Sequence, residues 1–160
     1  MISKSVSLKE STRSNTAARF GIDNTPNPTQ LEAMVHTAEH IIDSVRKQFG
    51  DAVDVSSFFR SEKLNKKVGG SKSSQHCKGE AVDLDSRDNA LNLAIFNFIK
   101  DNMVFDQLIA EYVDQSGVPS WIHVSFVDTS KYPNRTNRQQ VLVKLKDRYI
   151  PYGEYQVGMT

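Results

Sequence analysis

The stretch "SSQHCKGEAVDLD", residues 73–85, contains one of the four histidines of the chain, its only cysteine and three acidic residues around a glycine. Its second half alternates, which predicts a strand whose two aspartates share one face. Asp83 lies in the middle of that strand, where a carboxylate is costly unless it is paired or bound to a metal. Because Gly79 lets the backbone turn, His76 and Asp83 can converge on one ion. We therefore predict that this stretch enters a sheet beside a polar site.

The composition is typical of a soluble globular chain, with 38% hydrophobic and 24% charged residues. A length of 160 residues suits one domain, so we expect a single domain over residues 1–160, with residues 1–28 as an N-terminal arm. The net charge of +1 disfavours binding to duplex nucleic acid, because such binders carry a basic excess. One cysteine cannot form an internal disulfide, so no disulfide framework supports the fold.

The first residues, "MISKSVSLKESTRSN", lack the apolar segment of a secretory signal. No apolar run approaches the length of about 20 residues that a membrane span requires. We therefore expect a protein that is made in the cytoplasm without a signal peptide, has no membrane span and is a monomer.

Outward from the opening stretch, the periodicity predicts a small set of elements. A helix is expected from Thr29, with Glu32 completing a capping box, to Phe49, where Gly50 ends it. A second helix is expected at residues 89–102. Strands are expected within residues 51–60, 80–85, 105–113, 121–127 and 139–149, and residues 61–73 are expected to form a polar loop with room for one helical turn. This order predicts an α+β fold with a small, mostly antiparallel sheet and helices packed on one side.

The strands at residues 105–113 and 121–127 are expected to pair as a hairpin. If they pair antiparallel about Gly117, Glu111 lies directly opposite His123, with the two Cβ atoms about 5 Å apart. A slip of one residue would separate the two side chains onto opposite faces. A histidine in a strand is more often structural, but a facing carboxylate favours a functional site.

Together these residue types indicate a catalytic metal centre. Two histidines and one aspartate leave one position open on a tetrahedral zinc, as catalytic zinc sites require. A glutamate beside the ion can act as general base to the attacking water and then as acid to the leaving amine. Arg60, at the end of "SSFFR", has the geometry to hold a substrate carboxylate in a bidentate fork, although a surface arginine is the alternative.

The segment "SSFFRSEKLNKKVGGSKSSQHCKGEAVDLD", followed by "FDQLIAEY" and "PSWIHVSF", resembles the zinc D-Ala-D-Ala carboxypeptidase family. That family includes vancomycin-resistance D,D-carboxypeptidases and phage L-alanyl-D-glutamate endolysins, and it shares its zinc fold with the hedgehog signalling domain. The resemblance covers roughly residues 7–145 and depends most on the S-x-H-x6-D and W-x-H motifs. The stretch "STRSNTAARFGIDNTPNP" is similar to the phage and prophage branch in particular.

The resemblance implies a role for several residues. It implies that zinc is held by His76, Asp83 and His123, that Arg60 positions the substrate and that Ser74 is the motif serine. We expect Ser74 or Gln75 to help Arg60 hold a substrate carboxylate. Several members carry an acid three residues before the last histidine, where this chain has Ser120. The phage branch has a glutamate in the preceding strand, which corresponds to Glu111, the residue that the hairpin also indicates. The usual "SGYR" is "SFFR" here, which leaves the substrate preference open.

Two hypotheses for the function follow. The first is a zinc peptidase that hydrolyses a bond in bacterial peptidoglycan peptide stems, of the D-Ala-D-Ala carboxypeptidase or L-Ala-D-Glu endopeptidase type. It would act on the cell wall as a phage or prophage lysis enzyme or a virion enzyme. The alternative is a non-catalytic, zinc-containing module that binds cell wall or protein, and the absence of an acid at Ser120 motivates it.

Other eye-catching residues favour structural roles. Cys77 adjoins a predicted ligand but need not point at the same ion. His36 and His40 are four residues apart, yet "HTAEH" lacks the glutamate position of an H-E-x-x-H metal motif. The lysines of "KLNKKVGGSK" suit the rim of the site, where they can meet an anionic cell-wall polymer. Asp85 either supports a metal ligand or ends its strand in solvent.

Overall fold

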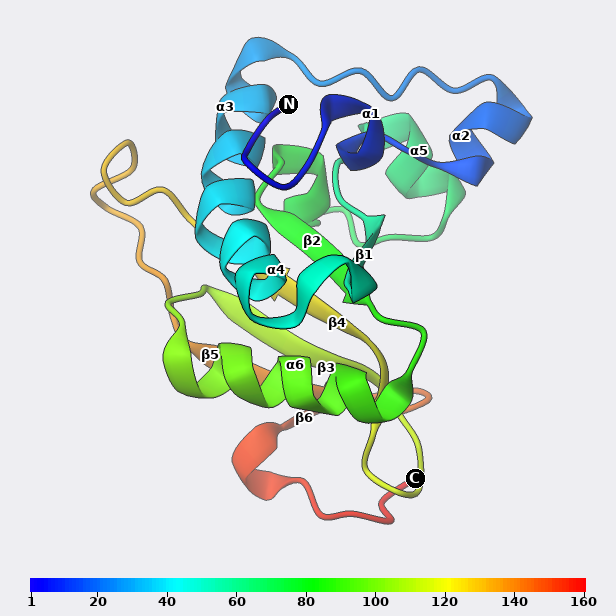
Figure 1. The fold of residues 1–160 in the computed structure, drawn as a ribbon. Coiled ribbons are helices and arrows are strands. Elements are labelled where there is room, and N and C mark those ends of the chain that lie inside the picture. Colours follow the sequence, from blue (N-terminus) through cyan, green and yellow to red (C-terminus); the bar gives the residue numbers. More distant parts are fainter.

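A computed structural model describes residues 1–160. The helical elements (Figure 1) are α1 (Leu8–Ser11), α2 (Asn15–Phe20), α3 (Pro28–Thr37), the π-helix η1 (Ala38–Ile42), α4 (Asp43–Phe49), α5 (Glu62–Lys67), α6 (Asn89–Asn102) and the 3-10 turns η2 (Gly50–Ala52), η3 (Gln75–Lys78) and η4 (Tyr152–Glu154). The strands are β1 (Asp54–Ser57), β2 (Ala81–Asp85), β3 (Gln107–Val113), β4 (Pro119–Ser125), β5 (Gln140–Lys144) and β6 (Tyr149–Pro151). No helix has both the length and the apolar character needed to cross a membrane.

The six strands form one sheet in the order β1-β2-β4-β3-β5-β6. The α+β class is confirmed, but the sheet is mixed, because β3 and β5 run parallel while the other neighbours are antiparallel. After β4 the chain passes the end of the sheet where β3 begins. It then enters β5 from that same end, on the side of β3 away from β4, so β3 and β5 run parallel. The predicted last strand is in fact a hairpin, since the chain turns back after β5 and forms β6.

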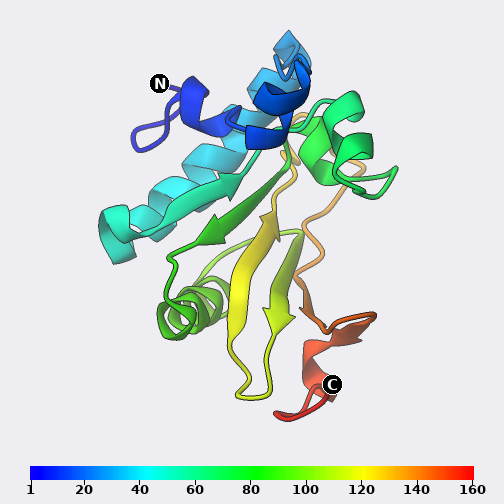
Figure 2. The ribbon, with the colours of Figure 1, turned by 90° about the vertical axis from the view of Figure 1, so that its right-hand side faces the viewer.

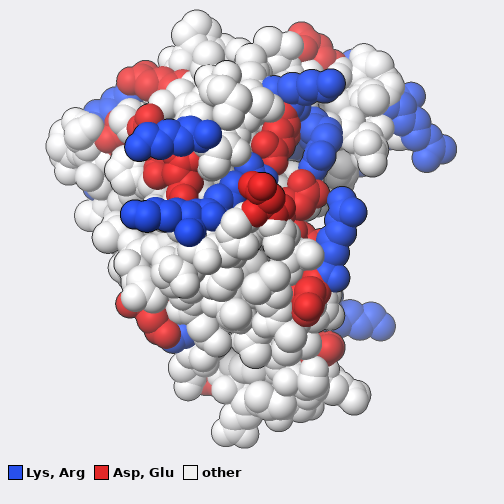
Figure 3. Space-filling view, viewed as in Figure 1, with Lys and Arg blue, Asp and Glu red and all other residues white.

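The helices α3, α4 and α6 lie on one face of the sheet, in front of the strands in Figure 1, and Figure 2 shows α6 nearly along its axis beside these strands. Alternate residues of the strands are buried beneath these helices, as the period of two requires. On the outer side of this layer, the surface over the middle of α6 carries no charged side chain, and charges gather over the N-terminal arm and α3–α4 (Figure 3). The central core residues include Met34, Ile41, Ile42, Val82, Leu84, Ile95, Phe96, Ile99, Leu108, Ile122 and Val124.

The first long helix begins two residues earlier than the sequence predicts. Asn27 is its N-cap: the Asn27 side chain accepts from the Gln30 amide at 2.9 Å, and the Gln30 side chain accepts from the Asn27 amide at 2.8 Å. Pro28 occupies the first helical position, where its missing N–H group needs no partner. The predicted capping box at Thr29 and Glu32 is therefore wrong, while Gly50 ends α4 with a φ of 71° as expected.

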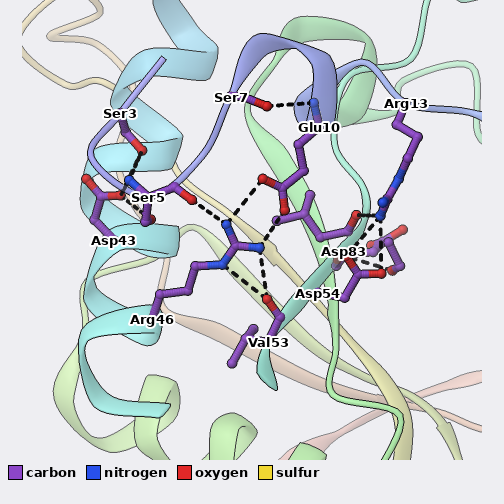
Figure 4. Close-up of polar contacts among 12 residues, drawn as sticks. Ser3, Ser5, Ser7, Glu10, Arg13, Asp43, Arg46, Val53, Asp54 and Asp83 are labelled. Carbon is purple, nitrogen blue, oxygen red and sulfur yellow. Dashed lines mark hydrogen bonds and ion pairs between the residues drawn. The ribbon is translucent and has the colours of Figure 1, made fainter. Parts of the chain in front are cut away.

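The N-terminal arm contains α1 and α2 and is held against α4 by a set of polar contacts, which we call the N-terminal clamp: Ser3, Ser5, Glu10, Asp43 and Arg46 (Figure 4). The Arg46 guanidinium donates to the Ser5 carbonyl at 2.5 Å and pairs with the Glu10 carboxylate at 2.5 Å. Asp43 accepts from the hydroxyls of Ser3 and Ser5 and from the Ser5 amide. These charge-assisted bonds fasten the start of the chain to the helical layer.

Candidate active site

The face of the sheet opposite the helical layer carries a groove of about 700 Å³. One wall comes from the segment between α5 and η3, the floor comes from β2, β3 and β4, and Tyr149 of β6 lies at the other side. All of the site residues predicted from the sequence line this groove: Arg60, Ser74, Gln75, His76, Asp83, Glu111 and His123.

His76 lies on η3 and its side chain is 2% exposed. The turn ends at Gly79, whose φ of 75° suits glycine, and an added Cβ there would lie 2.5 Å from the Gln30 carbonyl oxygen. The His76 Nδ1 atom is 2.7 Å from the Phe58 carbonyl oxygen, so Nδ1 carries the proton and donates it. Burial lowers the pKa of His76 and keeps the ring neutral. Its Nε2 atom is then a buried acceptor, and it has no hydrogen-bond partner.

Asp83 and His123 face each other across β2 and β4. The Asp83 Oδ1 atom lies 3.0 Å from His123 Nδ1 and 3.2 Å from His76 Nε2. Burial opposes ionisation of Asp83, but its hydrogen-bonding and charged neighbours, His123 among them, outweigh it and hold the pKa of this carboxyl well below its usual range. One ligand atom from each residue lies within 4.8 Å of the others, and we call this group the metal triad.

The metal triad can hold a cation. The unprotonated Nε2 of His76 faces a carboxylate oxygen, and two electron-rich atoms at 3.2 Å repel each other unless a positive charge lies nearby. Two imidazole nitrogens and one carboxylate oxygen are the donor set that zinc prefers, and three protein ligands leave a position open. The hydrogen bond from His76 Nδ1 to a backbone carbonyl is the usual way to orient a metal-binding histidine.

Glu111 is on the same sheet face as His123, but not directly opposite it. In the hairpin, Ile109 lies opposite His123 and Glu111 lies opposite Trp121, so the predicted direct pair is wrong by two residues. The turn is centred one residue earlier than Gly117, because the Asp114 side chain accepts from the Ser116 and Val118 amides and closes the loop there. A shift of two residues preserves the face, and Glu111 becomes a diagonal neighbour of His123.

The carboxylate of Glu111 is suited to proton transfer. Burial and the charge of Asp83 raise the pKa of Glu111, although nearby cationic groups oppose the shift. A carboxylate with a raised pKa binds a proton more readily near neutral pH, which a general base requires.

Arg60 borders the metal triad with part of its guanidinium free. Its Nη2 atom is 3.7 Å from Asp83 Oδ2, and its Nη1 atom is 3.4 Å from Asn65 Oδ1. Its Nε atom is buried and has no partner. Sequence reasoning missed Asn65, which is 5% exposed and also donates to the Ser71 carbonyl at 2.8 Å. A polar residue buried within "KLNKK" has no local signal, because its partners come from the next loop.

Ser74 and Gln75 open the turn that carries His76. Ser74 is at the N-cap position of η3 and makes no capping bond with its side chain. The Gln75 side-chain amide donates to Asp106 Oδ2 at 3.0 Å, so this amide nitrogen is already engaged by the protein.

The profile of the Peptidase M15 family matches residues 4–125, which include all the predicted site residues. The chain belongs to the M15 peptidase family. This match confirms the zinc peptidase family that the sequence motifs indicate. Membership in the family means that the protein is of the metallopeptidase class, with a peptide as substrate. No curated protein matches the sequence.

Several residues of this M15 peptidase lie outside the groove. Cys77 lines a separate hollow with Lys78 and Tyr132, and burial raises the pKa of its thiol, which disfavours a nucleophile. Asp85 accepts from the Asn92 side chain at the beginning of α6.

The two helix histidines, His36 and His40, contact residues other than those of the metal triad. His36 Nε2 lies 3.2 Å from Asp128 Oδ2, and the His40 ring stacks on Phe126 at 4.3 Å. The lysines at positions 63, 66, 67 and 72 are exposed on α5 and the loop after it, beside the groove.

An aromatic group at the groove was not predicted. Tyr112 and Trp121 meet edge to face at 5.2 Å, and Tyr149 reaches the groove from β6. Lys144 lies 4.1 Å above the Tyr149 ring. Tyr149 was missed because the sequence pattern merges β5 and β6 into one strand.

The "SFFR" variant affects the core more than the opening of the groove. The Phe58 and Phe59 side chains are 1% and 2% exposed. Phe58 contributes the carbonyl that accepts from His76, which any residue at this position can supply.

Proposed function

We propose that this M15 peptidase is a zinc-dependent hydrolase of the peptide stems of bacterial peptidoglycan, of the D-Ala-D-Ala carboxypeptidase or L-Ala-D-Glu endopeptidase type. The observation that carries the proposal is the convergence of one ligand atom from each of His76, Asp83 and His123 within 4.8 Å on the floor of the groove. Two buried atoms of groove residues, His76 Nε2 and Arg60 Nε, have no hydrogen-bond partner within the protein. A metal ion and a substrate group would supply these partners.

In this proposal, His76, Asp83 and His123 hold the zinc ion. When bound, zinc supplies a Lewis acid that polarises the scissile carbonyl and lowers the pKa of water. The hydrogen bond to the Phe58 carbonyl fixes the His76 tautomer and presents Nε2 to the site. The Asp83 carboxylate would offset one of the two positive charges of a bound zinc ion.

Glu111 is the general base. It takes a proton from the attacking water and passes it to the leaving nitrogen as the peptide bond breaks. Its position on the His123 face, diagonal to that ligand, supports this role, as does its raised pKa. General base catalysis of this kind contributes roughly 10²–10⁴-fold to a rate.

Arg60 binds a substrate carboxylate, with Ser74 and Gln75 contributing hydrogen bonds at the neighbouring wall. The free Nε and the long contacts at Nη1 and Nη2 support the Arg60 assignment, since a bidentate carboxylate would complete them. The Ser74 hydroxyl makes no capping bond and is available to a ligand.

The similarity of the N-terminal stretch to the phage and prophage branch supports a cell-wall lysis or virion enzyme that acts as a monomer on the wall. The exposed lysines beside the groove are consistent with an anionic polymer as the matrix.

Digestion of purified peptidoglycan, with mass spectrometry of the released fragments, tests the proposal and identifies the bond. The wild type should release stem-peptide fragments, a chelator should stop the release, and added zinc should restore it. Glu111→Gln should retain zinc and lose at least about 100-fold in rate. Glu39→Gln, an exposed glutamate on the helical layer, is the matched control.

Full activity of the Glu111→Gln variant would refute the assigned base. A wild type that binds the wall and zinc but releases nothing would instead favour the non-catalytic binding module.

A further inference from the structure

The loop between β4 and β5, residues 126–139, follows the part of the chain that matches the M15 family. Figure 1 shows it projecting beside α3 before it returns to β5. It wraps the end of the sheet at which β4 ends and β2 and β3 begin. The turn η3, which carries His76, precedes β2 at that same end.

Two arginines of this loop hold two buried carboxylates. Arg135 binds Glu80 through two bonds of 2.6 and 2.8 Å. Arg138 binds Asp106 in the same bidentate manner, with two bonds of 2.8 Å. The Glu80 and Asp106 side chains are 5% and 4% exposed. Paired bonds of this kind fix the direction of a carboxylate as well as its position.

Both carboxylates are attached to the ends of the His76 turn. At the start of the turn, the Gln75 side chain donates to Asp106 Oδ2 at 3.0 Å. After its end, the Glu80 amide donates to the Gln75 carbonyl at 3.0 Å, and the Glu80 carbonyl accepts from the Phe126 amide at 2.9 Å. One loop therefore holds both ends of the turn that presents His76.

The bonds within the turn are few and long, although the side chains of Gln30 and Thr37 also donate to its Cys77 and Gly79 carbonyls at 3.0 Å. The turn is four residues long, and its internal bonds include those from Cys77 to Ser74 at 3.2 Å and from Gly79 to His76 at 3.3 Å. A metal ligand must be held within about 0.5 Å of its productive position, and residues around it supply that precision.

We propose that Arg135 and Arg138 are positioning residues for the metal triad, acting through Glu80 and through the Asp106–Gln75 pair to hold the His76 turn. The inference rests on the proposed function only in taking His76 as a metal ligand. In this proposal, the loop of residues 126–139, which follows the part of the chain that matches the family, helps to set the affinity for the metal.

Zinc affinity of the full chain, measured by competition with a chromophoric chelator, tests the proposal. Arg138→Gln and Arg135→Gln should each weaken zinc binding by about tenfold, the low end of the effect of removing a group that supports a ligand. With Co²⁺ in place of zinc, the visible absorption bands should shift, because a displaced His76 changes the coordination geometry. Arg148→Gln, which alters an arginine bonded to the Thr160 carbonyl, is the matched control and should change neither readout.

Gln75→Met provides a second variant, because it removes the link to Asp106 and leaves both buried ion pairs intact. It should also weaken zinc binding by about tenfold. Folded variants that bind zinc within twofold of the wild type, with unchanged cobalt spectra, would overturn the proposal. A wild type that binds no zinc would overturn both the metal centre and this inference. A wild type that binds zinc but cleaves nothing would refute the peptidase proposal alone.

Discussion

Arg46 of the N-terminal clamp and Arg60 of the groove are both largely buried, with 13% and 18% of their side chains exposed. Arg46 donates from Nε and Nη2 to the Val53 carbonyl at 3.1 and 2.9 Å, besides its bonds to Ser5 and Glu10. Arg60 has a buried Nε without a partner and only long contacts elsewhere. Buried polar groups in folded proteins are almost always bonded. Folding therefore completes the hydrogen bonds of the clamp arginine but leaves those of the groove arginine incomplete.

The same contrast holds for the rest of the two regions. Three buried side-chain polar atoms have no hydrogen-bond partner, and two of them, on His76 and Arg60, lie at the groove. The clamp contributes none. An identical substitution at the two arginines should thus have opposite consequences for stability and activity.

Arg46→Met should produce the largest loss of stability, about 3 kcal/mol, because it leaves Glu10 and two carbonyls without their donor. Urea unfolding monitored by circular dichroism measures this loss. The rate of peptidoglycan cleavage by the folded variant should be unchanged. A loss of less than about 1 kcal/mol would show that water replaces the arginine in the clamp.

Arg60→Met should lower cleavage by about 30-fold, which corresponds to about 2 kcal/mol of lost substrate interaction. Its stability should change by less than about 1 kcal/mol, since few good bonds are removed. Steady-state kinetics on a defined stem peptide measures the effect. Arg60→Lys is the informative companion, because lysine retains the charge but lacks the fork and should recover only part of the rate. Wild-type kinetics for Arg60→Met would remove the proposed substrate role.

Asp43→Asn should have the smallest effect, about 1 kcal/mol, because solvent reaches the clamp around this carboxylate. Burial opposes ionisation of Asp43, but hydrogen bonds from Ser5, Ser3 and the backbone outweigh it and lower its pKa. Its stabilisation is therefore present above about pH 4, the range of an unfolded aspartate, and disappears as the pH falls through the lower folded value.

Urea unfolding at several pH values checks this dependence. The difference between wild type and Asp43→Asn should be constant from about pH 5 to 7 and should shrink below about pH 4. Asp51→Asn, an exposed aspartate on η2, is the control and should show no such convergence. A difference that grows as the pH falls would contradict the assigned direction.

Much of the site was predictable because its chemistry is carried by short motifs. The predicted helix at residues 89–102 has the bounds of α6, and its periodic apolar face explains that agreement. The spacing around Gly79 brought His76 and Asp83 together as expected. Glu111 was predicted on the correct face but in the wrong register, since a two-residue slip leaves the alternation of a strand unchanged.

Other features were not predictable from local pattern. The β5–β6 hairpin lacks the glycine-rich turn that would have divided the predicted strand. Asn65, Arg135 and Arg138 owe their positions to partners from distant parts of the sequence. In the sequence, an arginine of a polar loop that pairs with a buried carboxylate looks the same as one that is exposed to solvent. Only the fold shows which carboxylate lies next to it.

The amino-acid sequence by itself determined the two long helical segments and the strands other than β6, which face of each strand is apolar, and which side chains can bind a metal. These are properties of neighbouring residues, and periodicity and residue chemistry express them directly. Only the tertiary structure decided the parallel entry of β5, the register of the hairpin and the approach of residues 126–139 to the His76 turn. Those depend on turn geometry and on packing between distant segments, which no local pattern contains.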